Sequence, residues 1–98
     1  MSDEKTYNGW TNKFTWAVNL WFGGDEGLYA LQKELIAQRP RKSNGNDAEW
    51  EFAEMIRDAV RELVLEPLPA SLTSDLLGTA LGQVNWGEIA KSWLEDVE

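Results

Sequence analysis

The chain has 98 residues, 43% of them apolar and six of them tryptophan, which is enough for one domain with a hydrophobic core. It contains neither cysteine nor histidine, which excludes thiol nucleophiles, Ser–His–Asp catalysis and zinc sites built on those ligands. Its net charge of −8 opposes direct binding to nucleic acid, whose phosphates must be neutralised by lysine and arginine.

The charge is unevenly distributed along the chain. Residues 1–45 carry five acidic and six basic side chains, whereas residues 46–98 carry twelve acidic and three basic ones. Such asymmetry is typical of a surface that meets a partner. Because no apolar stretch is long enough to span a membrane and the N-terminus is polar, we expect a soluble, cytoplasmic protein.

The hydrophobic pattern predicts an all-α fold, with about five helices in one compact domain over residues 1–98. Residues 1–8 are expected to form a flexible N-terminal arm that ends at the turn signal Asn8-Gly9. No segment shows the sustained alternation typical of a strand, and no linker is long enough to divide the chain.

The first helix is predicted from a cap at Thr11 or Asn12 to about Phe22, where Gly23-Gly24 stops it. Its apolar residues lie nearly all round, which predicts a central, buried helix. The second helix is predicted from a cap at Asp25 to about Gln38. Its expected buried side comprises Leu28, Tyr29, Leu31, Leu35 and Ile36.

The remaining three helices are predicted between clear start and stop signals. The third runs from Asn46 to about Glu66, because Pro67 cannot continue it, and its expected core stripe is Phe52, Ile56, Ala59, Val60 and Leu63. The fourth begins at a cap at Ser71 or Thr73. The fifth begins at Asn85, which forms a capping-box pattern with Glu88, and ends near Asp96.

A series of acidic residues at helical spacing is the main candidate interface. On a helix, residues three and four apart lie on one face, so these carboxylates form a row about 28 Å long at ~1.5 Å per residue. The alternative is an ordinary solvated face, in which Arg57 and Arg61 neutralise part of the charge. The residues of this acidic row are Asp47, Glu51, Glu54, Asp58, Glu62 and Glu66.

The row does not suit catalysis or metal binding. Paired catalytic carboxylates must face each other across a cleft, with one of them in an apolar pocket. These carboxylates stand on a convex helix face, and Asn44-Gly45-Asn46-Asp47 lacks the ligand spacing of a calcium loop. We therefore expect no catalytic residue, no cofactor and no metal.

The tryptophans divide into two expected groups. Trp16, Trp21, Trp86 and Trp93 have the helical spacing of core residues. Trp10, in a turn, and Trp50, beside the acidic row, are expected to be partly exposed. An exposed aromatic side chain beside a charged surface suits an interface, so Trp50 joins the candidate partner-binding residues.

Residues 7–28 carry a distinctive pattern: Asn8-Gly9-Trp10-Thr11-Asn12, Thr15-Trp16, Asn19-Leu20-Trp21 and Asp25-Glu26-Gly27. It resembles a family of small phage- and plasmid-encoded proteins whose opening reads N-G-W-T-N-x-x-T-W, most of them of unknown function. The resemblance implies structural roles: Asn12 as a helix cap, Trp10 packed onto the helix and Trp16 in the core. Lys13-Phe14 replaces the Tyr and acid that are frequent there.

In size and acidity the chain also resembles anti-CRISPR and antirestriction proteins, several of which mimic DNA. We therefore expect an inhibitor, and not an enzyme, that acts in the cytoplasm of the bacterial host. It would bind a type I CRISPR surveillance complex through the acidic row and block target DNA binding. We expect a monomer, with a dimer as the alternative.

The alternative function is a protein–protein adaptor, or an antirestriction inhibitor, from a phage or plasmid. The adaptor would bind through an apolar surface around Trp50, Met55 and the last helix, with the acids serving solubility. Binding that does not weaken with salt but is lost on Trp50→Ala would favour it, whereas steep salt dependence would favour the acidic row.

Overall fold

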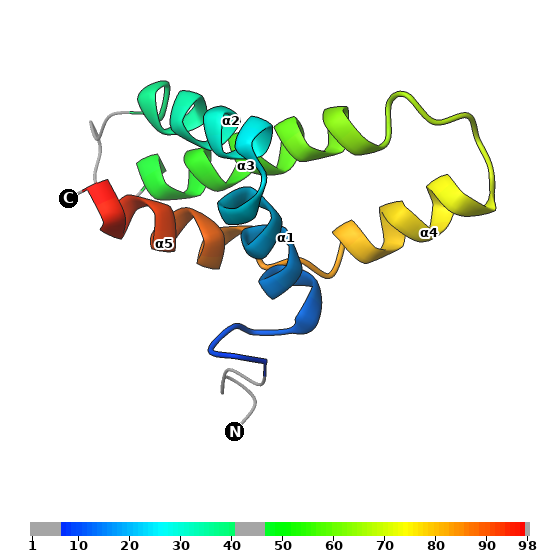
Figure 1. Ribbon diagram of the computed structural model, residues 1–98, viewed down its shortest axis with the longest axis horizontal. Coiled ribbons are helices and arrows are strands. Elements are labelled where there is room, and N and C mark those ends of the chain that lie inside the picture. Colours follow the sequence, from blue (N-terminus) through cyan, green and yellow to red (C-terminus); the bar gives the residue numbers. More distant parts are fainter. Residues whose placement is uncertain (1–6, 41–46, 98) are drawn as a thin grey trace.

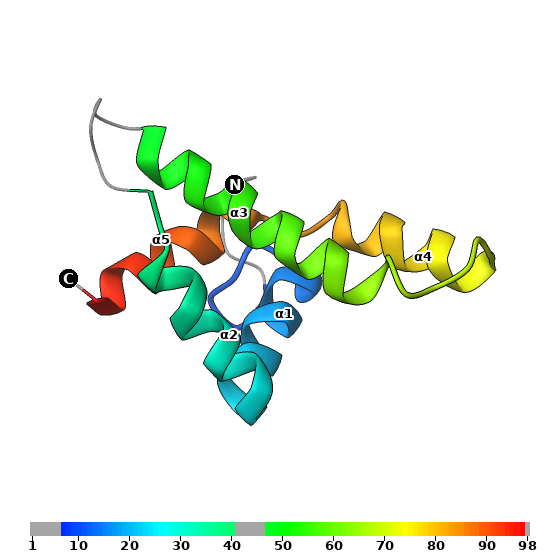
Figure 2. The same ribbon diagram turned by 90° about the horizontal axis from the view of Figure 1, so that it is seen from above.

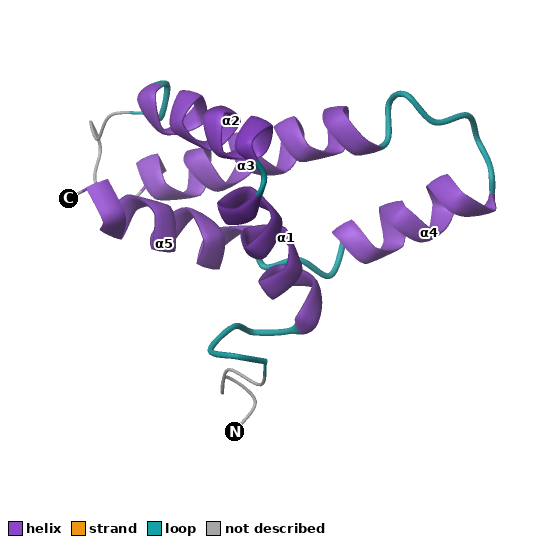
Figure 3. Ribbon diagram, viewed as in Figure 1, coloured by secondary structure: helices purple, strands orange, loops and turns teal. Residues whose placement is uncertain are grey.

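The structure is a computed structural model that describes residues 7–40 and 47–97 (Figure 1). Within these ranges the chain forms five α-helices and no strand, which confirms the predicted all-α domain (Figure 3). The helices are α1 (Lys13–Gly24), α2 (Glu26–Ala37), α3 (Asp47–Val64), α4 (Leu72–Leu81) and α5 (Trp86–Val97).

The helices are arranged as two packed pairs and one outlying helix. α3 and α5 pack across each other, and α1 and α2 form a second pair that lies in front of them, with α1 touching α5 (Figures 1 and 2). α4 lies beyond the C-terminal half of α3 and packs mainly against that helix. The core therefore lies where the two pairs meet.

Trp93 on α5 lies at the centre of the core. Its ring makes edge contacts with Phe22 of α1 and Phe52 of α3, at centroid distances of 5.1 and 6.2 Å. Its indole N–H donates to Asn19 Oδ1 at 3.0 Å, so the polar atom of this buried side chain is satisfied. The buried apolar residues are Phe22, Leu35, Phe52, Ala53, Ile56, Val60, Leu81, Val84, Ile89, Ala90 and Trp93.

Several predicted helix boundaries are confirmed. Asn12 caps α1, Asp25 caps α2, and Ser71 caps α4 in a reciprocal capping box with Ser74. The end of α1 differs slightly from the prediction, because the helix continues through Gly24 and Asp25 is the residue that terminates it.

The prediction of a central, buried first helix is wrong. Only Thr15 and Phe22 of α1 are buried, because the helix packs against α2 and α5 along one side and leaves its other side open. Trp21, predicted to lie in the core, is 62% exposed. Tyr29 of α2 is also exposed, and its ring carries the Lys33 ammonium 5.0 Å from the centroid.

The third helix is shorter than predicted at its C-terminal end. α3 ends at Val64, so Glu66 lies in the turn that leads to Pro67 and not on the helix. Phe52, Ile56 and Val60 form the expected core stripe, but Leu63 is exposed, whereas its neighbour Val64 packs against the core. The predicted start at Asn46 lies outside the described residues.

Candidate acidic interface and the N-terminal clasp

The acidic row is partly preserved on α3. Glu51, Asp58 and Glu62 are exposed and Glu54 is half-buried, whereas the core residues of the same helix face α5. Asp47 is the first residue of α3, and its side chain is outside the described part of the structure. Glu66 is exposed but lies beyond the helix end, so the helical part of the row, from Glu51 to Glu62, rises about 16 Å.

Arg57 neutralises the middle of this row. Its Nη2 atom lies 2.7 Å from Glu54 Oε1 and 3.1 Å from Asp58 Oδ1. The side chains in these pairs are 40%, 36% and 68% exposed, so solvent screens the pairs and each adds little stability. Within the described ranges Glu51 and Glu62 make no ion pair, so they carry the uncompensated charge.

Trp50 is the exposed aromatic residue that the sequence predicted beside the row, and 65% of its surface is exposed. It lines a shallow depression between α3 and the start of α5, which Trp86 also lines. Trp86 was predicted to be a core residue; it is half-buried, with one side packed against the core. The depression therefore joins two tryptophans that are 36 positions apart in the sequence.

The distinctive N-terminal pattern forms a polar clasp, which we define as residues 7–19 together with residues 83–93. Asn8 and Gly9 have positive φ angles of 51° and 88°, and the backbone groups of Tyr7 and Trp10 pair across this tight turn. The Tyr7 ring packs edge-on against Trp16 at 4.9 Å. Tyr7 and Asn8, which are predicted to lie in the N-terminal arm, form part of this turn.

Thr15 is the centre of the clasp. Its side chain is fully buried, and its hydroxyl donates to Asn12 Oδ1 at 2.9 Å and accepts from the Asn85 backbone N–H at 2.8 Å. Asn12 caps α1 through its Oδ1 atom and donates its amide N–H to the Gln83 carbonyl at 2.7 Å. The predicted cap role of Asn12 is confirmed, with a second role that the pattern alone did not indicate.

The start of α5 completes the clasp. The Asn85 side chain caps the helix at the Glu88 N–H, which is half of the predicted capping box. In a complete capping box the Glu88 side chain would accept from the Asn85 N–H. Here the Asn85 N–H donates to the Thr15 hydroxyl instead, and Glu88 Oε1 accepts from the Thr11 N–H at 3.0 Å. The clasp thus links two segments about 70 residues apart.

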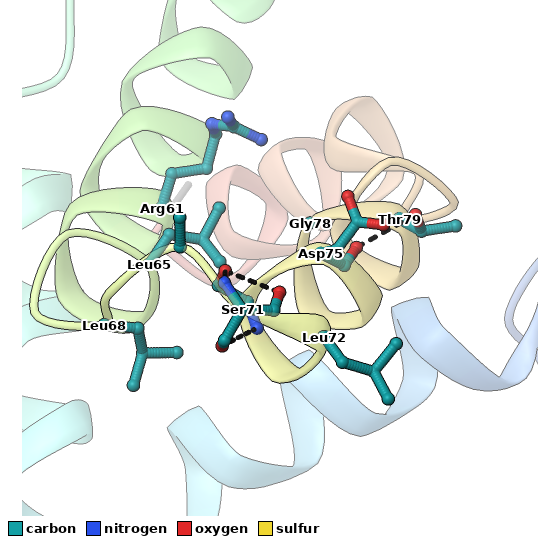
Figure 4. A pocket seen from close by; sticks show the side chains of 10 residues that line it. Arg61, Leu65, Leu68, Ser71, Leu72, Asp75, Gly78 and Thr79 are labelled. Atoms are coloured by element: carbon teal, nitrogen blue, oxygen red, sulfur yellow. Dashed lines mark hydrogen bonds between the residues drawn. The ribbon is translucent and has the colours of Figure 1, made fainter.

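A second depression lies between the end of α3 and α4 (Figure 4). Leu65 faces Gly78 across it, and a Cβ atom added at Gly78 would lie 3.9 Å from Leu65 Cδ1. Its rim carries both a base, Arg61, and an acid, Asp75, so it has no single charge preference. Leu72 on the same rim is 74% exposed.

Among residues 7–40 and 47–97, no group of three or more acidic side chains could hold a metal ion. No helix in those ranges is both long and apolar enough to cross a membrane.

The side chains that the structure adds to the predicted site are Trp86 and Glu49, which line the depression beside Trp50. Sequence spacing could not connect them, because only the packing of α5 on α3 brings them together.

The fold and this surface define a small all-α domain with an acidic face on one helix and a hydrogen-bonded N-terminal clasp. The match to a family model extends over residues 3–92, and the chain belongs to the family of unknown function DUF7249. Searches of curated proteins and of solved structures gave no match.

Proposed function

We propose that the protein inhibits a DNA-binding protein of a host defence system by occupying the basic groove that normally receives DNA. The observation that carries the proposal is the exposed row of carboxylates on α3, with Glu51 and Glu62 outside any ion pair of the described residues. The specific target that we propose is a type I CRISPR surveillance complex. Inhibition is stoichiometric and needs no catalytic residue.

Charge spacing and rigidity support this function. Carboxylates three and four residues apart on a helix lie about 5–6 Å from one another, and DNA phosphates follow at ~3.4 Å of axis per strand. The helical part of the row, at about 16 Å, corresponds to roughly half a turn of B-DNA. Because α3 is anchored by fully buried Phe52 and Ile56, the helix backbone that carries the row is fixed and only the side chains are ordered on binding.

The test is competition between the protein and target DNA for the purified surveillance complex at several salt concentrations. A variant with Glu51, Asp58 and Glu62 all changed to Lys should lose inhibition, and wild-type binding should weaken steeply with salt. Glu54 is left intact because, unlike exposed Asp58, it is half-buried as well as paired with Arg57. Full inhibition by the triple variant would overturn the proposal.

The matched control makes the same charge change away from α3. Glu34 on α2 and Glu95 and Asp96 on α5 are exposed, so their change to Lys leaves the row intact. This control should inhibit nearly as well as the wild type. Equal loss in both triple variants would show that only net charge matters, which would count against an interface on α3.

The second candidate function, a protein–protein adaptor, is favoured by one observation: large apolar side chains are exposed on several helices. Among them, Trp50 is 65% exposed and Leu72 is 74% exposed. An adaptor of this kind would bind its partner equally well in low and high salt. The salt series in the competition assay therefore separates the two candidates.

A further inference from the structure

The depression between α3 and the start of α5 is lined by apolar, aromatic and acidic residues. Its volume is about 620 Å³, within the range of small-ligand sites. Buried Ala53 and Val84 contribute its apolar part. Two tryptophans and two glutamates also line it, and none of its described lining residues is basic. These residues are Glu49, Trp50, Ala53, Glu54, Val84, Asn85, Trp86 and Gly87.

The tryptophans offer aromatic surface to a ligand. Trp50 keeps 65% of its surface in solvent, and Trp86 is held against the core on one side only. A cation near the face of an indole is attracted by the ring's quadrupole, and tryptophan is the strongest partner of this kind. Two such rings lining one depression favour a flat or cationic group over an anion.

The glutamates favour a positively charged ligand group. Glu49 is exposed and takes part in no ion pair of the described residues, and Glu54 is held by Arg57 through one carboxylate oxygen. A purely apolar ligand would remove these carboxylates from water without replacing their hydrogen bonds. A guanidinium group suits both the tryptophans and the glutamates, because it stacks on aromatic faces and donates two parallel hydrogen bonds to a carboxylate.

The clasp holds one wall of the depression in place. Asn85 lines the depression, and its backbone N–H is fixed by the buried hydroxyl of Thr15 at 2.8 Å. The preceding Gln83 carbonyl accepts from Asn12, so both ends of this turn are tied to the N-terminal segment. A wall fixed before binding lowers the entropy lost when a ligand is captured.

We propose that this depression receives an arginine side chain of the partner protein, in contact with Trp50 and Trp86 and paired with Glu49. The inference rests on the proposed function for the source of that arginine, which is the basic DNA-binding surface of the partner. It gives the acidic face of α3 an anchor at its N-terminal end, where Trp50 lies.

The first test uses a tetra-arginine peptide and, as a neutral isostere, a tetra-citrulline peptide. The indole N–H signals of ¹⁵N-labelled protein are followed by NMR during each titration. Saturable shifts at Trp50 and Trp86 with arginine, but not with citrulline, would support the proposal. Exposed Trp21 on α1 serves as the internal control. Equal shifts with citrulline, or shifts at Trp21 as large as those at Trp50, would overturn it.

The second test uses matched variants of exposed residues, which leave the core intact. Trp50→Ala should weaken binding of tetra-arginine about three- to tenfold, whereas Trp21→Ala should leave it unchanged. Glu49→Gln should weaken it more than Glu62→Gln, although both remove one carboxylate from α3. Equal effects within either pair would reduce binding to general charge attraction and would overturn the proposal.

These outcomes are separable from the fate of the proposed function. The peptide titration needs no surveillance complex, so the depression can bind arginine even if inhibition of DNA binding is not observed. Conversely, the Lys variant of Glu51, Asp58 and Glu62 can abolish inhibition while tetra-citrulline binds as well as tetra-arginine. In that case the proposed arginine site is overturned, whereas the proposed inhibition of DNA binding is supported.

Discussion

The clasp and the outer surface of α3 use their polar side chains in opposite ways. In the clasp, Asn12, Thr15 and Asn85 are hydrogen-bonded to one another or to the backbone of the other segment. On α3, Glu51 and Glu62 point to solvent without an ion-pair partner among the described residues. Polar groups that are satisfied internally serve the fold, whereas those left open are available to a partner.

This difference explains how a distinctive sequence pattern can say little about function. The N-terminal pattern positions α1 and the turn before α5 through hydrogen bonds of Thr11, Asn12 and Thr15 to residues 83–88. The candidate interface lies instead on α3, in a segment that the pattern does not include. The clasp bears on the interface only through Asn85, which lines the arginine-binding depression that we propose.

The largest contrast that we predict is between two tryptophans of the same chain. Trp93→Ala should lower the free energy of unfolding by about 3–5 kcal/mol, because it removes a ring that is 1% exposed and contacts Phe22 and Phe52. Trp21→Ala should cost less than about 1 kcal/mol, since that side chain is 62% exposed. Urea denaturation of both variants measures the difference, and similar losses would contradict the described core.

The next effect concerns the clasp. Thr15→Val keeps the shape of the buried side chain but leaves the Asn85 N–H without its acceptor, which should cost about 1–3 kcal/mol. Thr15→Ser retains the hydroxyl and should cost only about 1 kcal/mol for the lost methyl group. Thermal unfolding of the two variants gives the comparison, and a Val variant as stable as the Ser variant would show that the hydroxyl is not needed.

The sequence predicted local structure well because caps and stop signals act within one turn. Asn12, Asp25 and Ser71 cap their helices as expected, since each needs only a backbone N–H two or three residues ahead. The exposure of Trp21 could not be predicted, because the apolar pattern of α1 does not specify which of its sides α2 and α5 cover. Apolar residues all round α1 predict a buried helix, but the packing of α2 and α5 leaves Trp21 exposed.

The candidate site was predictable only in part for the same reason. The row from Glu51 to Glu62 follows from helical spacing, whereas the pairing of Arg57 with both Glu54 and Asp58 depends on the side-chain conformations. Trp86 had the spacing of a core residue, and its place in the same depression as Trp50 depends on how α5 packs against α3. The parts of the candidate site that helical spacing did not predict therefore depend on side-chain conformations and on contacts between distant segments.

A smaller effect, on binding affinity, is expected when the cation that neutralises the middle of the acidic row is removed. Arg57→Gln removes the cation beside Glu54 and Asp58, so the inhibitor should bind its basic target about two- to fivefold more tightly. Stability should change by less than about 1 kcal/mol, because these ion pairs are solvent-exposed. The DNA competition assay measures the affinity, and weaker inhibition would mean that Arg57 itself contacts the partner.

The smallest effect that we predict has the opposite sign and concerns α4. Gly78 lies inside this helix, where glycine costs about 0.5–1 kcal/mol relative to alanine. A Cβ atom there would meet only Leu65 Cδ1, at an ordinary contact distance of 3.9 Å. Gly78→Ala should therefore stabilise the protein by about 0.5–1 kcal/mol and slow hydrogen exchange of the α4 amides more than those of α5.

Amide exchange distinguishes this local effect from a general one. If α4 opens independently of the core, as its exposed Leu72 and Leu76 suggest, the added methyl group should protect α4 while leaving exchange at buried Ile89 and Trp93 nearly unchanged. Equal protection in α4 and α5 would mean that both helices unfold only with the whole domain. Destabilisation by Gly78→Ala would instead show that α4 packs more closely on Leu65 than the 3.9 Å separation allows.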